Sequence, residues 1–176
     1  MTMRRLLRAV ALVAVALVVV VPVSLGGSSR GKPKPPPSPP PAGAQVSAAA
    51  DSAFAPGTTY AGLSLRDSSV GAGVVIGSSG STTGDFEMQV NGTVGSGTTN
   101  VQRSITIQGT VTSGQVNSDG SVTFAGTGTQ DLGNGTSPTS VAFTVTATTS
   151  KITLQIGGTT LKTQSLQDGS IFIGPN

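Results

Sequence analysis

The sequence predicts an all-β fold, an antiparallel meander of about nine or ten short strands that forms a small barrel, preceded by an export helix and a Pro-rich linker. Two observations predict it. Apolar and polar residues alternate in segment after segment beyond residue 45. Gly, Ser, Asn and Asp separate these segments at spacings of about 8 to 15 residues, so the connections are short. Closed β forms protect strand edges, which favours a barrel, and a β-sandwich is the alternative.

Residues 1–26 are predicted to be a signal peptide or an N-terminal membrane anchor. Three arginines among the first eight residues precede an unbroken run of Ala, Leu and Val at residues 9–21. This run has the length of a signal-peptide core and is shorter than the roughly 20 residues that span a bilayer. Small residues allow cleavage after Gly26; an uncleaved anchor, with membrane contact only through residues 6–25, is the alternative. Everything that follows is expected to be secreted or extracytoplasmic.

Residues 27–44 are predicted to be a disordered, Pro-rich linker. Seven of the ten residues at 32–41 are prolines. Consecutive prolines fix φ and remove backbone donors, so the segment favours an extended polyproline II spacer. At about 3 Å per residue the cluster spans roughly 30 Å. We therefore expect a stalk that carries a single domain, residues 45–176.

The first part of this domain gives uneven signals. The small residues at 46–55 suggest a turn of helix or a loop. A first strand is expected at 60–65, with Leu63 and Leu65 on one face, followed by a short apolar run at 74–76. Residues 85–90 are clearer, because their apolar members (Phe86, Met88, Val90) alternate with polar ones (Asp85, Glu87, Gln89). That alternation predicts a strand with one face in water.

The second part of the domain continues the pattern. A strand is expected from Val101, Ile105 and Ile107, and a hairpin loop at 117–120 joins the strand ending near Val116 to one that carries Val122 and Phe124. Later strands are predicted from Val141, Phe143, Val145 and Ala147, from Ile152, Leu154 and Ile156 before a Gly157-Gly158 turn, and from residues 171–173.

The absence of histidine and cysteine from all 176 residues excludes several chemistries. No imidazole base, no His-activated nucleophile and no thiolate or imidazole zinc site can be built. We therefore expect no catalytic residues, no metal site and no cofactor. The remaining nucleophile system would pair Lys151 with Thr148 or Lys162 with Thr159, three residues earlier in each case. Because companion motifs are absent, a Ser/Thr–Lys hydrolase is the least favoured function.

The charge of the chain is divided unevenly. The net charge is +3, yet six of the ten basic residues and none of the seven acids lie in the first 44 positions. The domain retains four basic and seven acidic residues, which gives −3. A basic surface is the electrostatic requirement for binding nucleic acid, so we expect no nucleic-acid partner.

The candidate ligand-binding residues form one hypothesis, a site at the mouth of a barrel cavity. Arg103 shares the parity of Val101 and Ile105, so a regular strand places its guanidinium on the apolar face. At the mouth of a barrel cavity it would hold a carboxylate or phosphate; otherwise it snorkels to water near a strand end. The apolar lining of such a cavity would come from Phe86, Met88, Phe124 and Phe143.

Two other polar groups have simpler interpretations. Asp85 and Glu87 lie about 7 Å apart on one strand face, and little aromatic surface is present to stack a sugar, so they indicate a solvated face. Asn117, Asp119 and Ser121 are typical of a hairpin turn, because no glutamate closes a calcium loop there.

The sequence thus predicts an exported cell-envelope or secreted β domain on a Pro-rich stalk, non-catalytic, with a structural or surface-interaction role. The alternative is a barrel-type binding module for a small apolar or anionic ligand. A void of a few hundred Å³ inside the domain would favour the binding module, and a packed interior the structural role.

Overall fold

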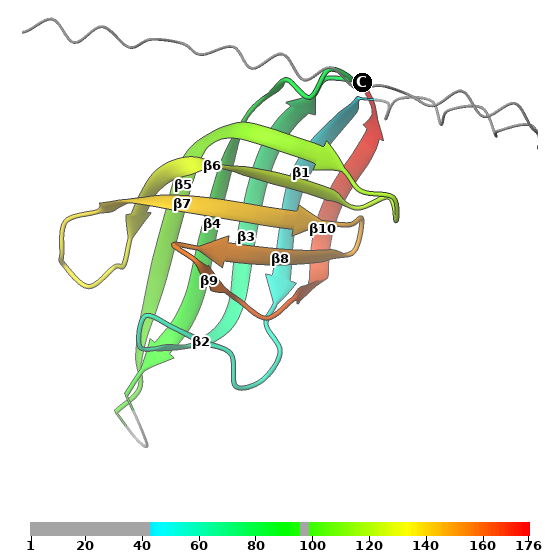
Figure 1. Cartoon of the computed structure of the whole chain (residues 1–176). Helices are drawn as coiled ribbons and strands as arrows, with labels where there is room; N and C mark the ends of the chain where they lie inside the picture. Colours follow the sequence, from blue (N-terminus) through cyan, green and yellow to red (C-terminus); the bar gives the residue numbers. More distant parts are fainter. Residues whose placement is uncertain (1–42, 96–98) are drawn as a thin grey trace, which may run out of the picture. The chain divides into compact units, whose positions relative to one another are not determined.

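The computed structural model describes residues 43–95 and 99–176; the predicted export segment and most of the predicted linker lie outside these residues. The described residues contain ten strands, and every pairing between strands is antiparallel (Figure 1). None of them forms a helix long and apolar enough to cross a membrane. The strands are β1 (Ala44–Ala53), β2 (Thr59–Tyr60), β3 (Leu63–Ile76), β4 (Thr82–Val94), β5 (Val101–Val116), β6 (Val122–Asp131), β7 (Thr139–Ala147), β8 (Lys151–Ile156), β9 (Thr159–Thr160) and β10 (Gln164–Pro175).

Eight of these strands are bonded in a ring. The order is β1-β10-β8-β7-β6-β5-β4-β3, and β3 pairs back to β1, while the two-residue strands β2 and β9 attach to β3 and β8. The all-β, antiparallel prediction is therefore confirmed. The β8–β10 joint is short, with register pairs only at Gln164–Ile152 and Ser165–Lys151. By contrast, all ten residues of β1 pair with β10 on one side and with β3 on the other.

The strands run in two main directions. Figure 1 shows β6, β7 and β8 crossing the direction of β1, β3, β4 and β10. β5 turns from one direction into the other, and its register with β6 is irregular between Val111 and Ser113. Such a bulge bends a strand and raises its local twist. One long strand therefore belongs to both groups, and the interior lies between them.

Strand β1 corrects the expectation of a helical turn or loop at residues 46–55. Its inward side chains (Val46, Ala50, Ser52) are buried, and they alternate with exposed ones. Small residues give little local preference, so the decisive factor is tertiary: hydrogen-bonded neighbours on both edges hold this segment extended.

Strand β3 joins two segments that the sequence separates. Leu63 and Leu65 and the apolar run at 74–76 all belong to β3, which spans Leu63–Ile76. The expected strand at 60–65 is corrected at its start, because Tyr60 belongs to β2 and residues 61–62 form the turn between β2 and β3. Gly71 and Gly73 lie between these two apolar segments, and glycine weakens a strand. Here β1 and β4 pair with both residues, so the strand continues.

The other predicted strands are present, with the predicted faces in the clearest case. Phe86, Met88 and Val90 are buried, whereas Asp85, Glu87 and Gln89 are exposed. The expected hairpin loop connects β5 to β6. At the β8–β9 turn, Gly157 and Gly158 have φ angles of 54° and 87°, as a type I′ turn requires.

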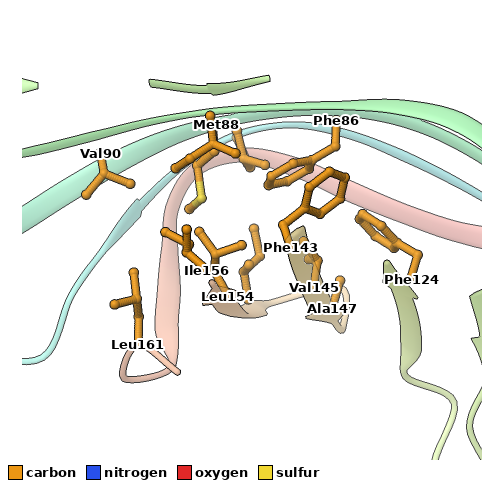
Figure 2. Packing of buried hydrophobic residues seen from close by; sticks show 14 of the residues in the cluster. Phe86, Met88, Val90, Phe124, Phe143, Val145, Ala147, Leu154, Ile156 and Leu161 are labelled. Atoms are coloured by element: carbon orange, nitrogen blue, oxygen red, sulfur yellow. The ribbon is translucent and has the colours of Figure 1, made fainter. Parts of the chain in front are cut away.

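Aromatic side chains fill the interior. The Phe86 ring lies 5.0 Å from the Phe143 ring in a stacked arrangement and 5.9 Å from the Phe124 ring, edge to face. Figure 2 shows Met88, Leu154 and Ile156 packed beside these rings. Glycines on β5 and β6 make room for them: a Cβ atom at Gly109 or Gly126 would come within 3 Å of the Phe143 ring.

We predict that Phe86→Ala lowers the free energy of unfolding by about 3–5 kcal/mol, because it leaves a cavity against two other rings. Val101→Ala is the control, since Val101 is 64% exposed and should change stability by about 0.5 kcal/mol or less. Guanidinium unfolding followed by circular dichroism measures both. Equal effects of the two substitutions would show that the aromatic cluster is not the core.

Candidate functional site

A solvent-open trough lies on the outer face of β3, β4 and β5. Its floor is Gly71 and Gly73, and a Cβ atom added at either glycine meets nothing within 4 Å. Gly71 is opposite Glu87 in the β3–β4 register, and Gly73 is opposite Asp85. On β5, Gln108 and Thr110 continue the same two rows. The depression has a volume of about 560 Å³.

The trough carries negative charge and hydrogen-bonding groups. Gln108 donates a hydrogen bond from Nε2 to Glu87 Oε1 at 2.9 Å. Asp85 and Glu87 are exposed, so their carboxylates retain solvent contact. Carboxylates, an amide and a hydroxyl can bind hydroxyl or amine groups of a partner. The pair that the sequence indicated as a solvated face is thus one wall of the trough.

A second depression, of about 370 Å³, continues this face across β1 and β10. Asp51 and Asp168 are directly opposite each other in the β1–β10 register. Ser69 donates its hydroxyl to Asp51 Oδ1 at 2.6 Å. Carboxylates from three strands, β1, β4 and β10, therefore lie on this outer face, with β3 between β1 and β4.

The residues predicted to bind a ligand separate into two groups. Phe86, Met88, Phe124 and Phe143 are each at most 2% exposed and pack on one another and on the rest of the core (Figure 2). Arg103 is half-buried near the start of β5, opposite Gly92. Gly109, the β5 residue opposite Phe86, lies six positions further on, roughly 20 Å at the rise of a strand. The structure brings the four apolar residues together and leaves Arg103 apart from the aromatic rings.

A buried polar cluster, which the sequence did not indicate, joins β1, β3 and β10. Gln164 Oε1 accepts hydrogen bonds from the hydroxyls of Ser52, at 2.7 Å, and Ser68. These two hydroxyls also lie 2.9 Å apart. Gln164 Nε2 is buried and has no hydrogen-bond partner among the described residues. In the sequence, the indication of this cluster is that Ser52, Ser68 and Gln164 each occupy an inward-facing position of a strand whose other inward positions are mostly apolar.

The hydroxyl–lysine pairs take part in local structure. Thr148 Oγ1 accepts hydrogen bonds from the backbone N–H groups of Ser150, at 3.3 Å, and Lys151, at 3.0 Å, in the β7–β8 turn. Lys162 donates from Nζ to the Pro56 carbonyl oxygen at 3.3 Å. These contacts organise turns and a loop.

The β5–β6 turn contains a carboxylate with a perturbed pKa. Asp119 Oδ1 accepts hydrogen bonds from the Ser121 hydroxyl at 2.6 Å and from the Ser121 backbone N–H at 3.0 Å. Chiefly the hydroxyl, and then the backbone N–H, hold the pKa of Asp119 below its ordinary value of 3.8. This pattern is that of a self-contained Asx-type turn.

Comparison with known proteins adds no assignment, because no family model, no curated protein and no solved structure matches the chain. Within residues 43–95 and 99–176, no three or more Asp or Glu side chains are grouped closely enough to hold a metal ion.

We predict that Gln164→Leu lowers the free energy of unfolding by about 1–3 kcal/mol, because it removes the shared acceptor of two buried hydroxyls. Adding Ser52→Ala and Ser68→Ala should restore part of this loss, since the remaining buried polar groups are then removed. Urea unfolding of the single and triple variants measures the difference. A triple variant less stable than the single one would contradict the explanation.

We predict that Asp119 titrates below pH 3.8 and that Ser121→Ala raises its pKa. A lowered folded-state pKa contributes stability above the pKa of the unfolded chain, and this contribution is lost as pH falls through the folded value. The variant should therefore lose less stability on acidification than the natural chain. Carboxyl-carbon NMR titration measures the pKa, and Asp119→Asn, which cannot titrate, is the control. An unchanged pKa in Ser121→Ala would exclude the hydroxyl as the cause.

Proposed function

We propose that this protein is an exported, non-catalytic β domain of the cell envelope or the secreted fraction, displayed on a Pro-rich stalk. In this proposal it acts through contacts of its outer surface. Export and display rest on the sequence of residues 1–44, with its arginine-flanked apolar run and its proline cluster.

The packed aromatic interior is the observation that supports a surface role. We infer that the ring of eight strands is a small closed barrel, since at eight strands an interior is just wide enough for side chains to fill it. Phe86, Phe124 and Phe143 occupy that space with ring contacts of 5.0 and 5.9 Å. With the core occupied by the chain's own side chains, a partner is expected on the outside.

The outer trough is the contact surface that we propose. Its glycine floor exposes backbone, and Asp85, Glu87, Gln108 and Thr110 supply side-chain hydrogen bonds along two rows. The trough is open and polar, which suits an extended polymer better than an enclosed small molecule. A hydroxyl- or amine-bearing envelope polymer fits this chemistry.

The test fills the trough without disturbing the fold. Gly71→Gln with Gly73→Gln should leave the chain folded, because both Cβ positions are empty and glycine is unfavourable within strands. We expect retention on insoluble cell-envelope material to fall by about tenfold, equivalent to about 1.4 kcal/mol. Co-sedimentation measures retention, and Ser140→Gln, an exposed position on β7, is the matched control.

Two results would contradict the surface proposal. One is unchanged retention of the trough-filled variant. The other is saturable binding of the apolar anion 1-anilinonaphthalene-8-sulfonate to the folded protein, reduced by Arg103→Met, which would support the interior binding module. We expect Arg103→Met to have no effect on probe binding and to leave stability equal or improved, because the guanidinium shares the parity of the buried Ile105.

A further inference from the structure

Strand β10 has a free edge. One side of β10 pairs with β1 along its length, while the other side pairs with β8 only at Gln164 and Ser165, next to a hydrogen bond from Leu166 N to Ser150 O at 3.0 Å. From Gln167 to Pro175, none of the described residues on that other side pairs with the backbone of β10. Four consecutive residues from Gln167 are exposed, as expected where no strand covers the edge.

The ladder with β1 fixes which backbone groups face the free edge. Asn176 N donates to Gly43 O at 3.2 Å, so residue 176 directs its backbone groups toward β1. Backbone direction alternates along a strand in an antiparallel ladder. The register is continuous from Asp168 to Pro175, so the even-numbered residues face β1. The odd-numbered residues of the regular ladder, Ile171, Ile173 and Pro175, therefore direct N–H and C=O groups to the free edge. Gly169, with a φ angle of 77°, lies at the end of this ladder.

Two of these four positions offer no donor. The Gly169 N–H already donates to Asp168 Oδ1 at 2.7 Å. Pro175 has no N–H, and prolines within sheets occur where the missing donor would face solvent. The available donors on this edge are therefore the N–H groups of Ile171 and Ile173. A charged residue and a proline limit the edge to a short segment, as in other sheets with exposed edges.

We propose that this edge binds the same edge of a second copy of the chain, antiparallel, with Phe172 on the two-fold axis. In that register Ile171 of each copy is opposite Ile173 of the other, and each pair exchanges two hydrogen bonds. Gly169 is opposite Pro175, so the two positions without a donor face each other. Every free donor on the edge is satisfied.

The side chains agree with the same register. Phe172 is 59% exposed on the outer face, and the symmetry places it opposite its own copy as an aromatic pair. Asp168 is opposite Asn176, and the two Asp168 carboxylates lie at opposite ends of the interface. A register centred on Ile171 would instead place Ile173 opposite Gly169, whose N–H is already bonded to Asp168. The edge is thus complementary to itself, which an isologous interface requires. This inference does not depend on the proposed function.

A cysteine test uses the fact that the full chain contains no cysteine. Facing residues of a pair without hydrogen bonds have Cα atoms about 4.5 Å apart, within the range of about 4.4–6.8 Å that a disulfide allows. Phe172→Cys should therefore form a covalent dimer on mild oxidation. Ser170→Cys, exposed on the same face of β10, is the matched control, because its copy would lie about 13 Å away. Equal cross-linking of the two variants, or preferential cross-linking of Ser170→Cys, would overturn the register.

Self-association of the full chain is the second measurement, by sedimentation velocity over a concentration series. Phe172→Lys places two ammonium groups opposite each other and should weaken dimerisation at least about tenfold. Val75→Lys, at a 42% exposed position on β3, should leave it unchanged, and circular dichroism checks that both variants fold. A natural chain that stays monomeric up to about 1 mM would overturn the proposal. The proposal would be overturned in the same way if the edge bound peptides of another sequence while the chain itself stayed monomeric.

Discussion

The packing of the Phe143 ring on bare backbone at Gly109 and Gly126 is the contact on which the rest of the structure depends. Gly126 is the register partner of Phe143 on β6, and a Cβ atom there would lie 2.9 Å from the ring. Because these glycines have no side chains, the two groups of strands lie close enough for the Phe143 and Phe86 rings to contact each other. The interior is then occupied, and the polar chemistry of the domain lies on its outer face.

A strand could be predicted from the sequence where its local apolar–polar alternation favours the same conformation as its tertiary contacts. Residues 85–90 alternate strongly, so their strand and both of its faces were predicted. β1 was not, because Ala and Ser carry little preference and only pairing on both edges determines their conformation. Gly71 and Gly73 interrupt the apolar pattern of β3, and pairing with β1 and β4 likewise keeps that strand continuous. The same two glycines, which weaken the strand pattern in the sequence, form the floor of the trough.

For the polar residues too, the sequence pattern indicates which face a side chain lies on, whereas the pairing of strands determines its neighbours. Parity placed Arg103 on the apolar side. The β4–β5 register, which no pattern along a single strand gives, puts roughly 20 Å of strand between Arg103 and the β5 residue opposite Phe86. The Ser52, Ser68 and Gln164 cluster joins residues up to 112 positions apart. Such a contact becomes visible only once β10 returns beside β1, and that pairing of the two ends of the domain is not encoded locally.

The β1–β10 ladder contains a pair of like charges, and the local contacts of the two carboxylates explain how the sheet accommodates it. Asp51 and Asp168 are opposite each other, and like charges in that position destabilise a sheet by up to about 1 kcal/mol. The register shift beside Asp51 disrupts the ladder there, and the two carboxylates bond in different directions, Asp51 to the Ser69 hydroxyl and Asp168 to the Gly169 N–H. Asp168 thereby removes one donor from the free edge, as Pro175 does at the other end. Because Asp168 and Pro175 leave the N–H groups of Ile171 and Ile173 available, the unprotected part of β10 is the three-residue segment 171–173, with the exposed Phe172 at its centre.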